Sequence, residues 1–442
     1  MPTNKGIRRN RWAMPTLPKW PKRRPRPIIL SLLFLFFGLN LSLAQEVEKP
    51  GLNLEELIDE ALRKNPQIQA ARKEWEAARE KVVGVKALPD PKLGIMFERI
   101  PKGTLSLDEA EMRMYTFSQM FPFPGKLGLK GEVAENMAAS LEWKYKAREQ
   151  EIVSKVKKAY WMLFFVHKSI RINKENKDLI QKFAKIAETR YAVGKAPQHD
   201  VLKAQVELSL LINELLDLEE ERETAEARIN TLLNRPISSP VGIPGQGEPS
   251  KFDLSLAEVE ILALKNRPEL KASMFGVKRS KSALSLAKKQ YLPDLMLEVS
   301  QRDMKGMGLD GWDAMLMVNI PLYFRKQKAG VKEAEGLQQE SLAKYESMGN
   351  MVRFQVKDSY LKVNEAQRLV ELFKNAIIPQ AEQMLKAAEV AYETERVDFL
   401  TLINSQKTLQ DVRLKRYKAL TRFERSLAEL ERVVGVSLVK KN

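Results

Sequence analysis

Residues 126–232 constrain the fold of this 442-residue chain more than any other stretch, because they predict two very long helices joined by a sharp turn. No proline occurs between Gly125 and Pro197, and apolar residues recur there at the spacing of a coiled-coil seam. The seam residues are Ile152, Val153, Val156, Ala159, Tyr160 and Leu163. The first helix would reach roughly 95–100 Å at about 1.5 Å per residue. A helix of this length cannot surround a compact core, so it must pack lengthwise against similar helices.

A duplication of about 200 residues is the second main feature of the sequence. Five groups of residues recur in the same order and at nearly constant offset. The recurring groups are Ala61-Leu62 with Asn65-Pro66 and Ala263-Leu264 with Arg267-Pro268, Leu88-Pro89-Asp90 and Leu292-Pro293-Asp294, Phe121-Pro122-Phe123 and Ile320-Pro321-Leu322, Tyr191 and Tyr392, and Gln205 and Gln406. Similar helix composition alone does not explain why both Leu-Pro-Asp triplets precede a run of alternating apolar residues. The sequence therefore predicts repeats at 45–235 and 255–435, joined by a Pro-, Gly- and Ser-rich linker at 236–254 and followed by a tail at 436–442.

Residues 1–44 have the features of a secretory signal peptide. They contain nine basic residues and no acidic one, followed by an apolar run over residues 28–43 that ends in small side chains. A retained membrane anchor is the alternative, although the apolar run is short for a stable span. Translation begins at Met1 or Met14, and the sequence does not choose between them. The sequence thus predicts an exported protein.

Without this leader the chain is only moderately basic. Removing its nine basic residues lowers the net charge from +17 to +8. The remaining charges are interspersed, as on solvated helix faces, so nucleic-acid binding is not expected. The chain contains no cysteine, which excludes disulfides and a lipid-modified N-terminal cysteine.

Each repeat is expected to contain a helix, two strands and a long helical hairpin. In the first repeat the expected elements are a helix at 53–87, strands at 93–100 and 112–121, and the hairpin at 126–232. In the second repeat they are a helix at 255–290, two strands that include the alternating residues 295–300 and 314–320, and a hairpin that begins near Lys326, turns near Glu395 and ends at 433–435. Pro379 is expected to kink the first helix of the second hairpin.

The four strands suggest that part of the protein lies in a membrane. Each is about 8–10 residues long, which suffices to cross a bilayer when the strand is tilted. One face of each strand is largely apolar and the other is mixed. Four strands cannot close a barrel, and an open edge in lipid leaves backbone groups unpaired, so several chains must share a barrel of roughly 8, 12 or 16 strands. Two soluble β-hairpins on a coiled-coil protein are the alternative.

These motifs together resemble the TolC-like outer-membrane efflux protein family. The resemblance is carried by the two Leu-Pro-Asp triplets, Pro-Phe-Pro-Gly-Lys at 122–126, Tyr-Ala-Val-Gly at 191–194, and Asp-Val-Leu at 200–202 with Ala204 and Gln205. It covers essentially the whole mature chain. It implies a mainly α fold with a small transmembrane β part, in which a homotrimer builds a twelve-stranded β-barrel on a twelve-helix α-barrel. It also implies a periplasmic adaptor protein and an inner-membrane pump of the resistance–nodulation–division or ABC type as partners.

The resemblance places the two hairpin turns, 193–197 and 394–397, at a periplasmic tip where neighbouring helices hold the channel closed. Asp200 and Tyr392 match positions of one such link, in which a tyrosine hydroxyl donates to a carboxylate. The alternative is that Asp200 only favours a helix N-terminus and that Tyr392 only packs. Arg396 is a candidate second latch, displaced by one residue from the matching position.

Other residues near the tip are implied to bind the adaptor or to line the pore. The residues that match the adaptor-docking motif are Val193, Gly194 and Lys195. The second repeat departs from this motif at residues 394–396. Thr401 and Asn404 match positions that hold a ring of aspartates in some relatives, so the sequence predicts pore-lining residues there but no strong carboxylate ring.

Methionines are concentrated in the strands and in the loop between the last two. The residues noted are Met96, Met112, Met114, Met120, Met304, Met307, Met315 and Met317. Thioethers ligate Cu(I), so a copper or silver exporter is one interpretation. Methionine is also an ordinary apolar residue on barrel walls, and this is the interpretation that the sequence favours.

The sequence offers no candidate catalytic site and no metal-ligand spacing. His167 and His199 are the only histidines, and neither lies in a catalytic motif. Together with the resemblance to the TolC-like family, this leads us to expect a passive outer-membrane channel without a cofactor. It would be the exit duct of a tripartite efflux system that carries small molecules or ions across the periplasm and outer membrane of a Gram-negative-type bacterium. A duct for type I protein secretion and an exported coiled-coil scaffold without a pore are the alternatives.

Overall fold

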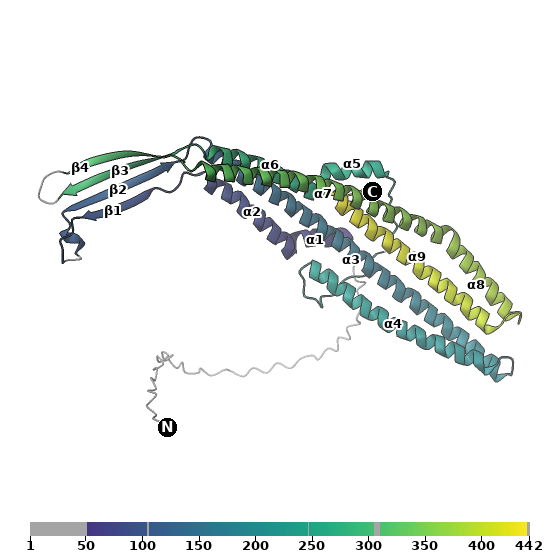
Figure 1. Ribbon diagram of the computed structural model, residues 1–442. Coiled ribbons are helices and arrows are strands. Elements are labelled where there is room, and N and C mark those ends of the chain that lie inside the picture. The colour runs from purple at the N-terminus through teal and green to yellow at the C-terminus, as the bar shows by residue number, and fades with distance from the viewer. Residues whose placement is uncertain (1–50, 104–105, 246, 305–309, 440–442) are drawn as a thin grey trace, which may run out of the picture. The chain divides into compact units, whose positions relative to one another are not determined.

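The computed structural model describes residues 51–103, 106–245, 247–304 and 310–439, and the predicted signal peptide and Met307 lie outside these ranges. In the described part, both halves of the chain follow the predicted order of elements (Figure 1). The first half contains α1 (Leu54–Lys64), α2 (Pro66–Lys86), β1 (Lys92–Glu98), the short 3-10 helix η1 (Leu107–Glu109), β2 (Met112–Phe121), α3 (Lys126–Ala192) and α4 (Gln198–Leu232). The second half contains α5 (Leu256–Asn266), α6 (Pro268–Lys289), β3 (Asp294–Met304), β4 (Gly311–Asn319), α7 (Phe324–Leu372), the π-helix η2 (Phe373–Ile377), α8 (Ile378–Glu393) and α9 (Phe399–Val434).

The helices form two rows, each with two neighbouring helices from each repeat. The proximal row, nearer the strands, contains α2, α3, α6 and α7 in that order (Figure 1). The distal row, toward the hairpin turns, contains α4, α3, α9 and then α7 with its continuation α8. α3 belongs to both rows because its 67 residues form one uninterrupted helix of about 100 Å, as predicted. Among the described helices, none combines the length and the apolar composition needed to span a bilayer.

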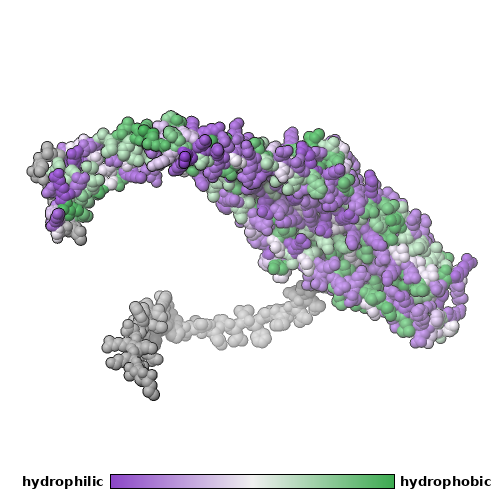
Figure 2. Space-filling model, viewed as in Figure 1, coloured by the Kyte–Doolittle hydropathy of each residue, from purple (hydrophilic) through white to green (hydrophobic). Residues whose placement is uncertain are grey.

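The four strands form a single antiparallel sheet in the order β1-β2-β3-β4. The two repeats meet at its centre, where β2 pairs with β3 from Met112 opposite Met304 to Phe121 opposite Leu295. β1 and β4 are the edge strands, and within the described residues neither has a partner on its outer side. Figure 2 shows hydrophobic residues gathered over the strands.

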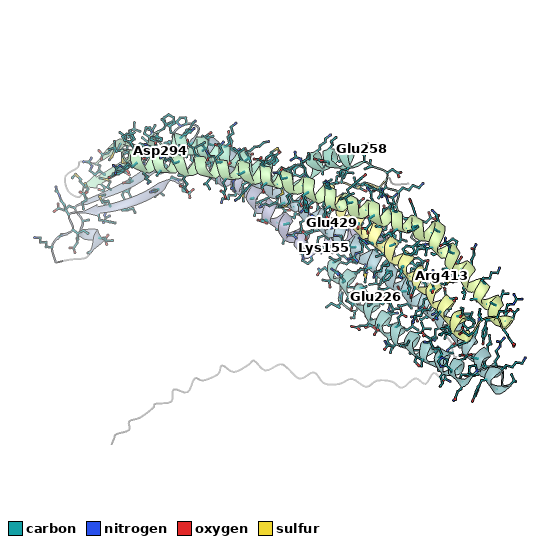
Figure 3. All side chains as sticks on the ribbon, turned by 45° about the vertical axis from the view of Figure 1, so that its right-hand side comes forward. Lys155, Glu226, Glu258, Asp294, Arg413 and Glu429 are labelled. Carbon is teal, nitrogen blue, oxygen red and sulfur yellow. The ribbon has the colours of Figure 1, made fainter. Side chains whose placement is uncertain are left out.

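Asp294 joins the sheet to the helices at the point where the two repeats meet (Figure 3). Its carboxylate accepts from the Nζ of Lys126, the buried first residue of α3, and from the N–H of Phe123, both at 2.8 Å. Lys126 also donates to the carbonyl of Leu292 at 2.7 Å. The Leu-Pro-Asp triplet of the second repeat therefore binds the Pro-Gly-Lys motif of the first.

The single helices predicted at 53–87 and 255–290 are wrong, because each is broken at a proline. α1 ends just before Asn65-Pro66 and α5 ends just before Arg267-Pro268, and each proline begins the next helix. In the first turn of a helix the backbone N–H has no partner within the helix, so proline costs nothing by lacking it. Inside a helix, proline removes a hydrogen bond and clashes with the preceding turn. The recurring pairs Asn65-Pro66 and Arg267-Pro268 are therefore junctions between two helices.

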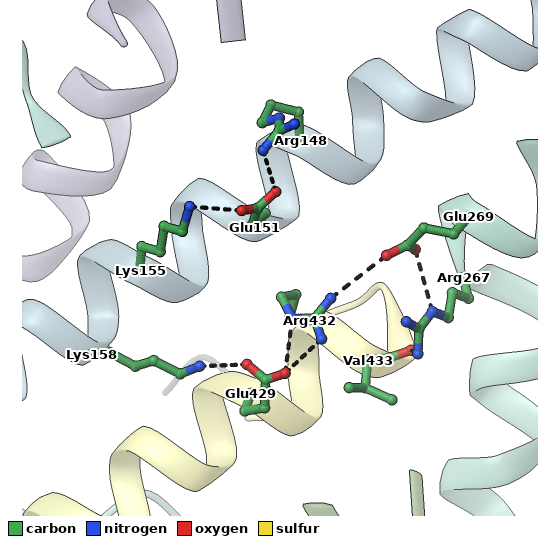
Figure 4. Close-up of polar contacts among 9 residues, drawn as sticks. All are labelled: Arg148, Glu151, Lys155, Lys158, Arg267, Glu269, Glu429, Arg432 and Val433. Atoms are coloured by element: carbon green, nitrogen blue, oxygen red, sulfur yellow. Dashed lines mark hydrogen bonds and ion pairs between the residues drawn. The ribbon is translucent and has the colours of Figure 1, made fainter. Parts of the chain in front are cut away.

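The residue before each of these prolines also binds the end of the last helix of its own repeat. Asn65 donates to the carbonyl of Leu232 at the end of α4, at 2.8 Å. In the second repeat the buried Arg267 donates to the carbonyl of Val433 near the end of α9, at 3.3 Å. Ion pairs that include Arg432 surround this second junction (Figure 4). Both junction residues thus satisfy carbonyl groups that a helix C-terminus leaves without a partner.

The predicted interruption of the second hairpin lies directly before Pro379. The five-residue π-helix η2 separates α7 from α8, and Pro379 lies in the first turn of α8. Because proline has no N–H and crowds the preceding turn, a wider turn relieves the strain there. The second hairpin therefore has a local irregularity that α3 lacks.

The linker between the repeats covers one side of the distal row. Phe252 is buried in one core cluster with residues of α1, α3, α5, α7 and α9, and its ring contacts that of Tyr360 on α7. Ser250 donates its N–H and its hydroxyl to the carboxyl group of Glu424 on α9, at 2.7 and 3.0 Å. α1, α5 and the linker therefore lie on one side of α3 and α9 and leave the other side open.

Glu424 should make the stability of this packing depend on pH. Burial raises the pKa of Glu424 to about 7, and Glu431 adds to this, whereas Ser250 and Lys157 lower it. The carboxyl group is therefore protonated up to about pH 7 in the folded chain, but it ionises near its ordinary pKa of 4.5 in the unfolded chain. The folded state consequently loses about 3 kcal/mol of stability as the pH rises from about 5 to 8.

Glu424→Gln tests this expectation, because glutamine keeps an acceptor for Ser250 and cannot ionise. We expect this variant to melt at a higher temperature than wild type at pH 8 and to remove the fall in melting temperature between pH 5 and 8. Thermal melts of the detergent-solubilised protein provide the measurement. Exposed Glu219→Gln on α4 is the control, and it should keep the wild-type pH dependence. If the melting temperature of Glu424→Gln falls between pH 5 and 8 as much as that of wild type, another titrating group causes the pH dependence.

Candidate functional site: the sheet, the open helix side and the tip

One face of the sheet, the apolar face, carries large hydrophobic side chains from all four strands. Its large residues are Leu93, Ile95, Phe97, Tyr115, Phe117, Phe121, Leu295, Leu297, Val299, Trp312, Leu316 and Val318. Many of them are strongly exposed, with 83% of Leu93 and 74% of Trp312 accessible. An apolar patch of this extent requires a cover, because soluble monomers rarely expose one.

The opposite face, the polar face, carries charged, hydroxyl and methionine side chains. Its charged and amide residues are Lys92, Glu98, Asp294, Glu298, Arg302, Asp313 and Asn319. Arg302 and Asp313 form an ion pair on it, with the Nε of Arg302 3.1 Å from the carboxylate. Along β3 the residues of the polar face are generally less exposed than those of the apolar face. In a soluble protein the apolar face of a sheet is buried and the polar face is exposed, and here the exposure is reversed. This fits strands with lipid against the apolar face and water against the polar face.

The two open edges make the sheet incomplete in lipid. Each edge strand presents a row of N–H and C=O groups, and each unpaired group costs several kcal/mol where no water can reach it. β1 and β4 therefore require further strands on their outer sides. The sheet has the composition of a barrel wall but only part of its circumference.

α9 carries a polar stripe, here called the α9 stripe, that runs from the hairpin turn along the open side of the distal row. Its residues, separated alternately by three and four positions and all exposed, are Thr401, Asn404, Thr408, Asp411, Lys415, Lys418, Arg422 and Arg425. This average spacing of 3.5 keeps them on one face of a supercoiled helix. The predicted pore-lining residues Thr401 and Asn404 are the first two of the stripe, and Asp411 is its only carboxylate.

A groove of 880 Å³ lies beside the α9 stripe, between α3, α7 and α9. Six basic and three acidic side chains line it, so its charge is mixed with a basic excess. Some of these charges are paired, as between Arg422 and Glu365 at 2.6 Å and between Lys362 and Asp358 at 2.6 Å. The open side of the distal row is therefore a hollowed, charged surface suited to contact with water.

A buried polar layer fixes α3 against the two returning helices. Gln406 of α9 donates to Asn176 of α3 at 2.6 Å, and Asn173 of α3 donates to Glu214 of α4 at 2.7 Å. Burial raises the pKa of Glu214. Buried polar groups with a defined set of partners fix the register of packed helices. This gives the recurring glutamine a structural role at Gln406, whereas its counterpart Gln205 in the first repeat is exposed.

The two hairpin turns at the tip have the same backbone geometry. The N–H of Lys195 in the first turn and that of Arg396 in the second each donate to the carbonyl five residues earlier, at 2.8 Å in both. Gly194 has a φ of 75° and Glu395 has a φ of 56°. A positive φ is easy for glycine but costs roughly 1–2 kcal/mol for other residues. The second repeat therefore departs from the docking motif in its side chains and not in its turn.

The predicted docking residues and the predicted second latch are accessible. Val193, Gly194 and Lys195 are exposed on the first turn, and Arg396 is exposed on the second. Arg396 forms no ion pair within the described part of the chain. These residues are therefore available for contact with another protein chain.

Tyr392 is buried at the end of α8, where it contacts Arg190 of α3. The guanidinium of Arg190 lies 4.4 Å from the centre of the Tyr392 ring, and its Nη1 donates to the Tyr392 carbonyl at 3.4 Å. Burial raises the pKa of the Tyr392 hydroxyl, Arg190 lowers it and Asp200 raises it. Burial also raises the pKa of Asp200. Among the described residues the Tyr392 hydroxyl has no hydrogen-bond partner, so its link to Asp200 stays a prediction.

Two tip residues were not found from the sequence. Arg190 has no basic counterpart in the second repeat, so the duplication did not point to it. Asp398 caps α9 and accepts from the N–H of Thr401 at 2.9 Å and from its hydroxyl at 2.6 Å, which lowers the pKa of Asp398. An aspartate directly before an apolar helical run is an N-cap signal that would have found it. Thr401 is thus held beside a carboxylate, although it carries none itself.

Known proteins with similar sequences and folds were compared with this chain. A sequence model of the family described as "Outer membrane efflux protein" matches residues 57–235 and 261–436. The chain is similar to the cobalt-zinc-cadmium resistance protein CzcC of Cupriavidus metallidurans, with 22% identity over 397 residues, which cover 87% of this chain and 90% of that protein.

Two solved structures have a similar fold. CusC is 16% identical with a TM-score of 0.76, over 89% of this chain and 96% of that chain. The outer membrane protein VceC from Vibrio cholerae is 17% identical with a TM-score of 0.73, over 87% of this chain and 96% of that chain. The family consists of channels that work with an adaptor and an inner-membrane pump, which favours efflux over protein secretion or a scaffold without a pore. Because the family model matches most of both halves, this chain belongs to the outer membrane efflux protein family and is an outer-membrane channel that extends into the periplasm, the exit duct of a tripartite efflux system.

Proposed function

We propose that three copies of this chain form a closed channel that conducts solutes passively from the periplasm through the outer membrane. The sheet carries this proposal, because its apolar face is exposed and its two edges are open. Pairing β1 of one copy with β4 of the next would close a twelve-stranded barrel, with the apolar face toward lipid and the polar face toward water. Three sets of helix rows would extend this wall into the periplasm.

The helix rows supply the tunnel below the barrel. The open side of the distal row faces inward in this arrangement, so the α9 stripe lines the tunnel and α1, α5 and the linker lie outside it. Thr401 and Asn404 then lie near the closed end, where the stripe carries no ring of carboxylates. The charged groove beside the stripe supports a water-filled path along α9.

The gate lies at the tip in this proposal. The contact between Arg190 and Tyr392 holds α8 against α3, and opening requires α8 and α9 to move away from α3. The π-helix η2 before Pro379 supplies a position at which α8 can swing. In the closed trimer the buried Tyr392 hydroxyl donates to Asp200, and Arg396 reaches a neighbouring chain.

The partners act at the same end of the molecule. Val193, Gly194 and Lys195 are the docking residues for a periplasmic adaptor, which connects the channel to an inner-membrane pump of the resistance–nodulation–division or ABC type. The pump provides the energy and the channel provides the path, which requires no catalytic group in this chain. The similarity to a cobalt-zinc-cadmium resistance protein supports metal ions as one class of solute.

Cysteine cross-linking should trap β1 of one chain beside β4 of another. The chain has no cysteine, so introduced pairs react alone. Within one chain β1 and β4 are the opposite edge strands, so Ile95 and any residue of β4 lie at least three strand spacings or about 14 Å apart. We therefore expect Ile95→Cys, combined in turn with Ala314→Cys, Leu316→Cys or Val318→Cys, to give covalent trimers with a cross-linker shorter than this distance.

Denaturing gels of cross-linked membranes provide the measurement for this prediction. Each single-cysteine variant is the matched control and should give no trimer band. If all three pairs yield only monomers in membranes that contain the folded protein, β1 and β4 do not meet between chains and the shared barrel is wrong.

Loosening the contact between Arg190 and Tyr392 should favour the open tip. A cation–π contact contributes about 0.5–2 kcal/mol, so Arg190→Gln should raise the mean conductance of single channels in planar bilayers severalfold. Tyr392→Phe keeps the ring and removes the hydroxyl, and we expect it to raise the conductance as well, since the closed trimer then loses the hydrogen bond to Asp200. Tyr191→Phe, at the exposed counterpart on the first turn, is the control. Wild-type conductance in Arg190→Gln would place the gate elsewhere.

A further inference from the structure

Every methionine of the four strands lies on the polar face of the sheet. These eight residues are Met96, Met112, Met114, Met120, Met296, Met304, Met315 and Met317. The strand residues of the apolar face include leucine, isoleucine, valine, phenylalanine, tyrosine, tryptophan and alanine, but no methionine. Methionine and the other apolar residues are therefore separated by face.

This separation argues against the interpretation that methionine serves here only as an ordinary apolar residue of the barrel wall. All other side chains on the polar face are charged, hydroxyl-bearing or amide, or the residue is glycine, so methionine supplies every apolar side chain there. If only apolar volume were needed, leucine or valine would serve on the polar face as they do on the other. The property that distinguishes methionine from them is its polarisable thioether sulfur.

The register of the sheet sets these methionines side by side. Met120, Met296 and Met317 are direct partners on β2, β3 and β4 and form a row of three. Two further direct pairs are Met96 with Met114 and Met112 with Met304. Directly opposite residues have Cβ atoms about 4.5–5.5 Å apart, which lets two or three long, flexible side chains bring their sulfurs to one ion.

We propose that the polar face binds Cu(I) or Ag(I) through these thioethers as the ions cross the barrel. Thioether sulfur is a soft, neutral ligand that selects such ions over Zn(II) or Co(II). The row of three lies at the helix end of the strands and the two pairs lie toward the loop end, so a passing ion meets sulfur ligands at both ends. Several weak sites along one path allow an ion both to enter and to leave. This inference rests on the proposed function, since it requires the polar face to line the barrel.

Silver binding to the purified protein in detergent tests this proposal, because Ag(I) is a soft ion that does not change oxidation state under these conditions. We expect wild type, incubated with silver nitrate in chloride-free buffer, to retain Ag(I) through gel filtration and to retain little Zn(II) or Co(II). The triple variant Met120→Leu, Met296→Leu, Met317→Leu, here called the strand variant, should bind Ag(I) at least about tenfold more weakly at this row. Mutating even a residue that only supports a metal ligand commonly lowers metal affinity by that much. Leucine has a similar volume, so the fold should persist.

The matched control, here called the helix control, removes the same number of thioethers from the helices. It carries Met274→Leu, Met351→Leu and Met384→Leu, and it should retain Ag(I) as wild type does. Conductance in planar bilayers, measured on every variant, separates this proposal from the proposed function. If the strand variant conducts normally and retains less Ag(I), the result supports the thioether path, by which we mean Ag(I) or Cu(I) binding by the methionines of the polar face.

Two results would overturn the thioether path and leave the duct intact: equal Ag(I) retention by wild type and the strand variant, or no retention by a wild type that conducts. Absence of conductance in wild type would overturn the duct itself. In cells, a deletion strain should regain silver tolerance with wild type and with the helix control, but not with the strand variant.

Discussion

A sheet that exposes its apolar face and leaves both edges unpaired imposes the main constraint on this protein. Lipid can cover the apolar face, but only further strands can satisfy the backbone groups of β1 and β4. The helices carry a related constraint, because the linker, α1 and α5 cover one side of the distal row and the other side remains hollow and charged. Both constraints would be met by the proposed assembly, in which copies of the chain join edge to edge around a water-filled axis.

The duplication builds this wall from matched parts and joins them at the motifs that recur. Asp294 of the second repeat binds Lys126 of the first, which fixes the sheet to the start of α3. Asn65 and Arg267 bind the carbonyls that end α4 and α9, each within its own repeat. The recurring motifs at Asp294, Asn65 and Arg267 therefore join separate elements of the fold. They hold the strands and the helix rows in one continuous wall.

The parts of the structure that depend on local pattern could be predicted from the sequence, and those that depend on pairing could not. The absence of proline predicted the length of α3, and alternation predicted the strands. Apolar periodicity continues across Pro66 and Pro268, so each break was hidden within one expected helix. Alternation also shows which residues of one strand share a face, but only the register between strands shows that Met120 and Met296 are direct partners. Arg190 meets Tyr392 through the packing of α3 against the second hairpin, which no local pattern records.

The charges of the α9 stripe bear on which metal ions such a channel can carry. From Lys415 to Arg425 the stripe contains basic residues alone, and Arg422 is paired with Glu365, so in the proposed tunnel a cation would meet a net positive potential. The resulting electrostatic cost is proportional to the charge of the ion, and a divalent ion such as Zn(II) therefore meets about twice the barrier of monovalent Cu(I) or Ag(I). In the proposed barrel, thioether ligands would replace the water that a soft monovalent ion loses but would bind a harder divalent ion only weakly. Electrostatics in the helices and ligand softness in the strands thus favour the same ions, although the two groups of residues lie in different parts of the fold.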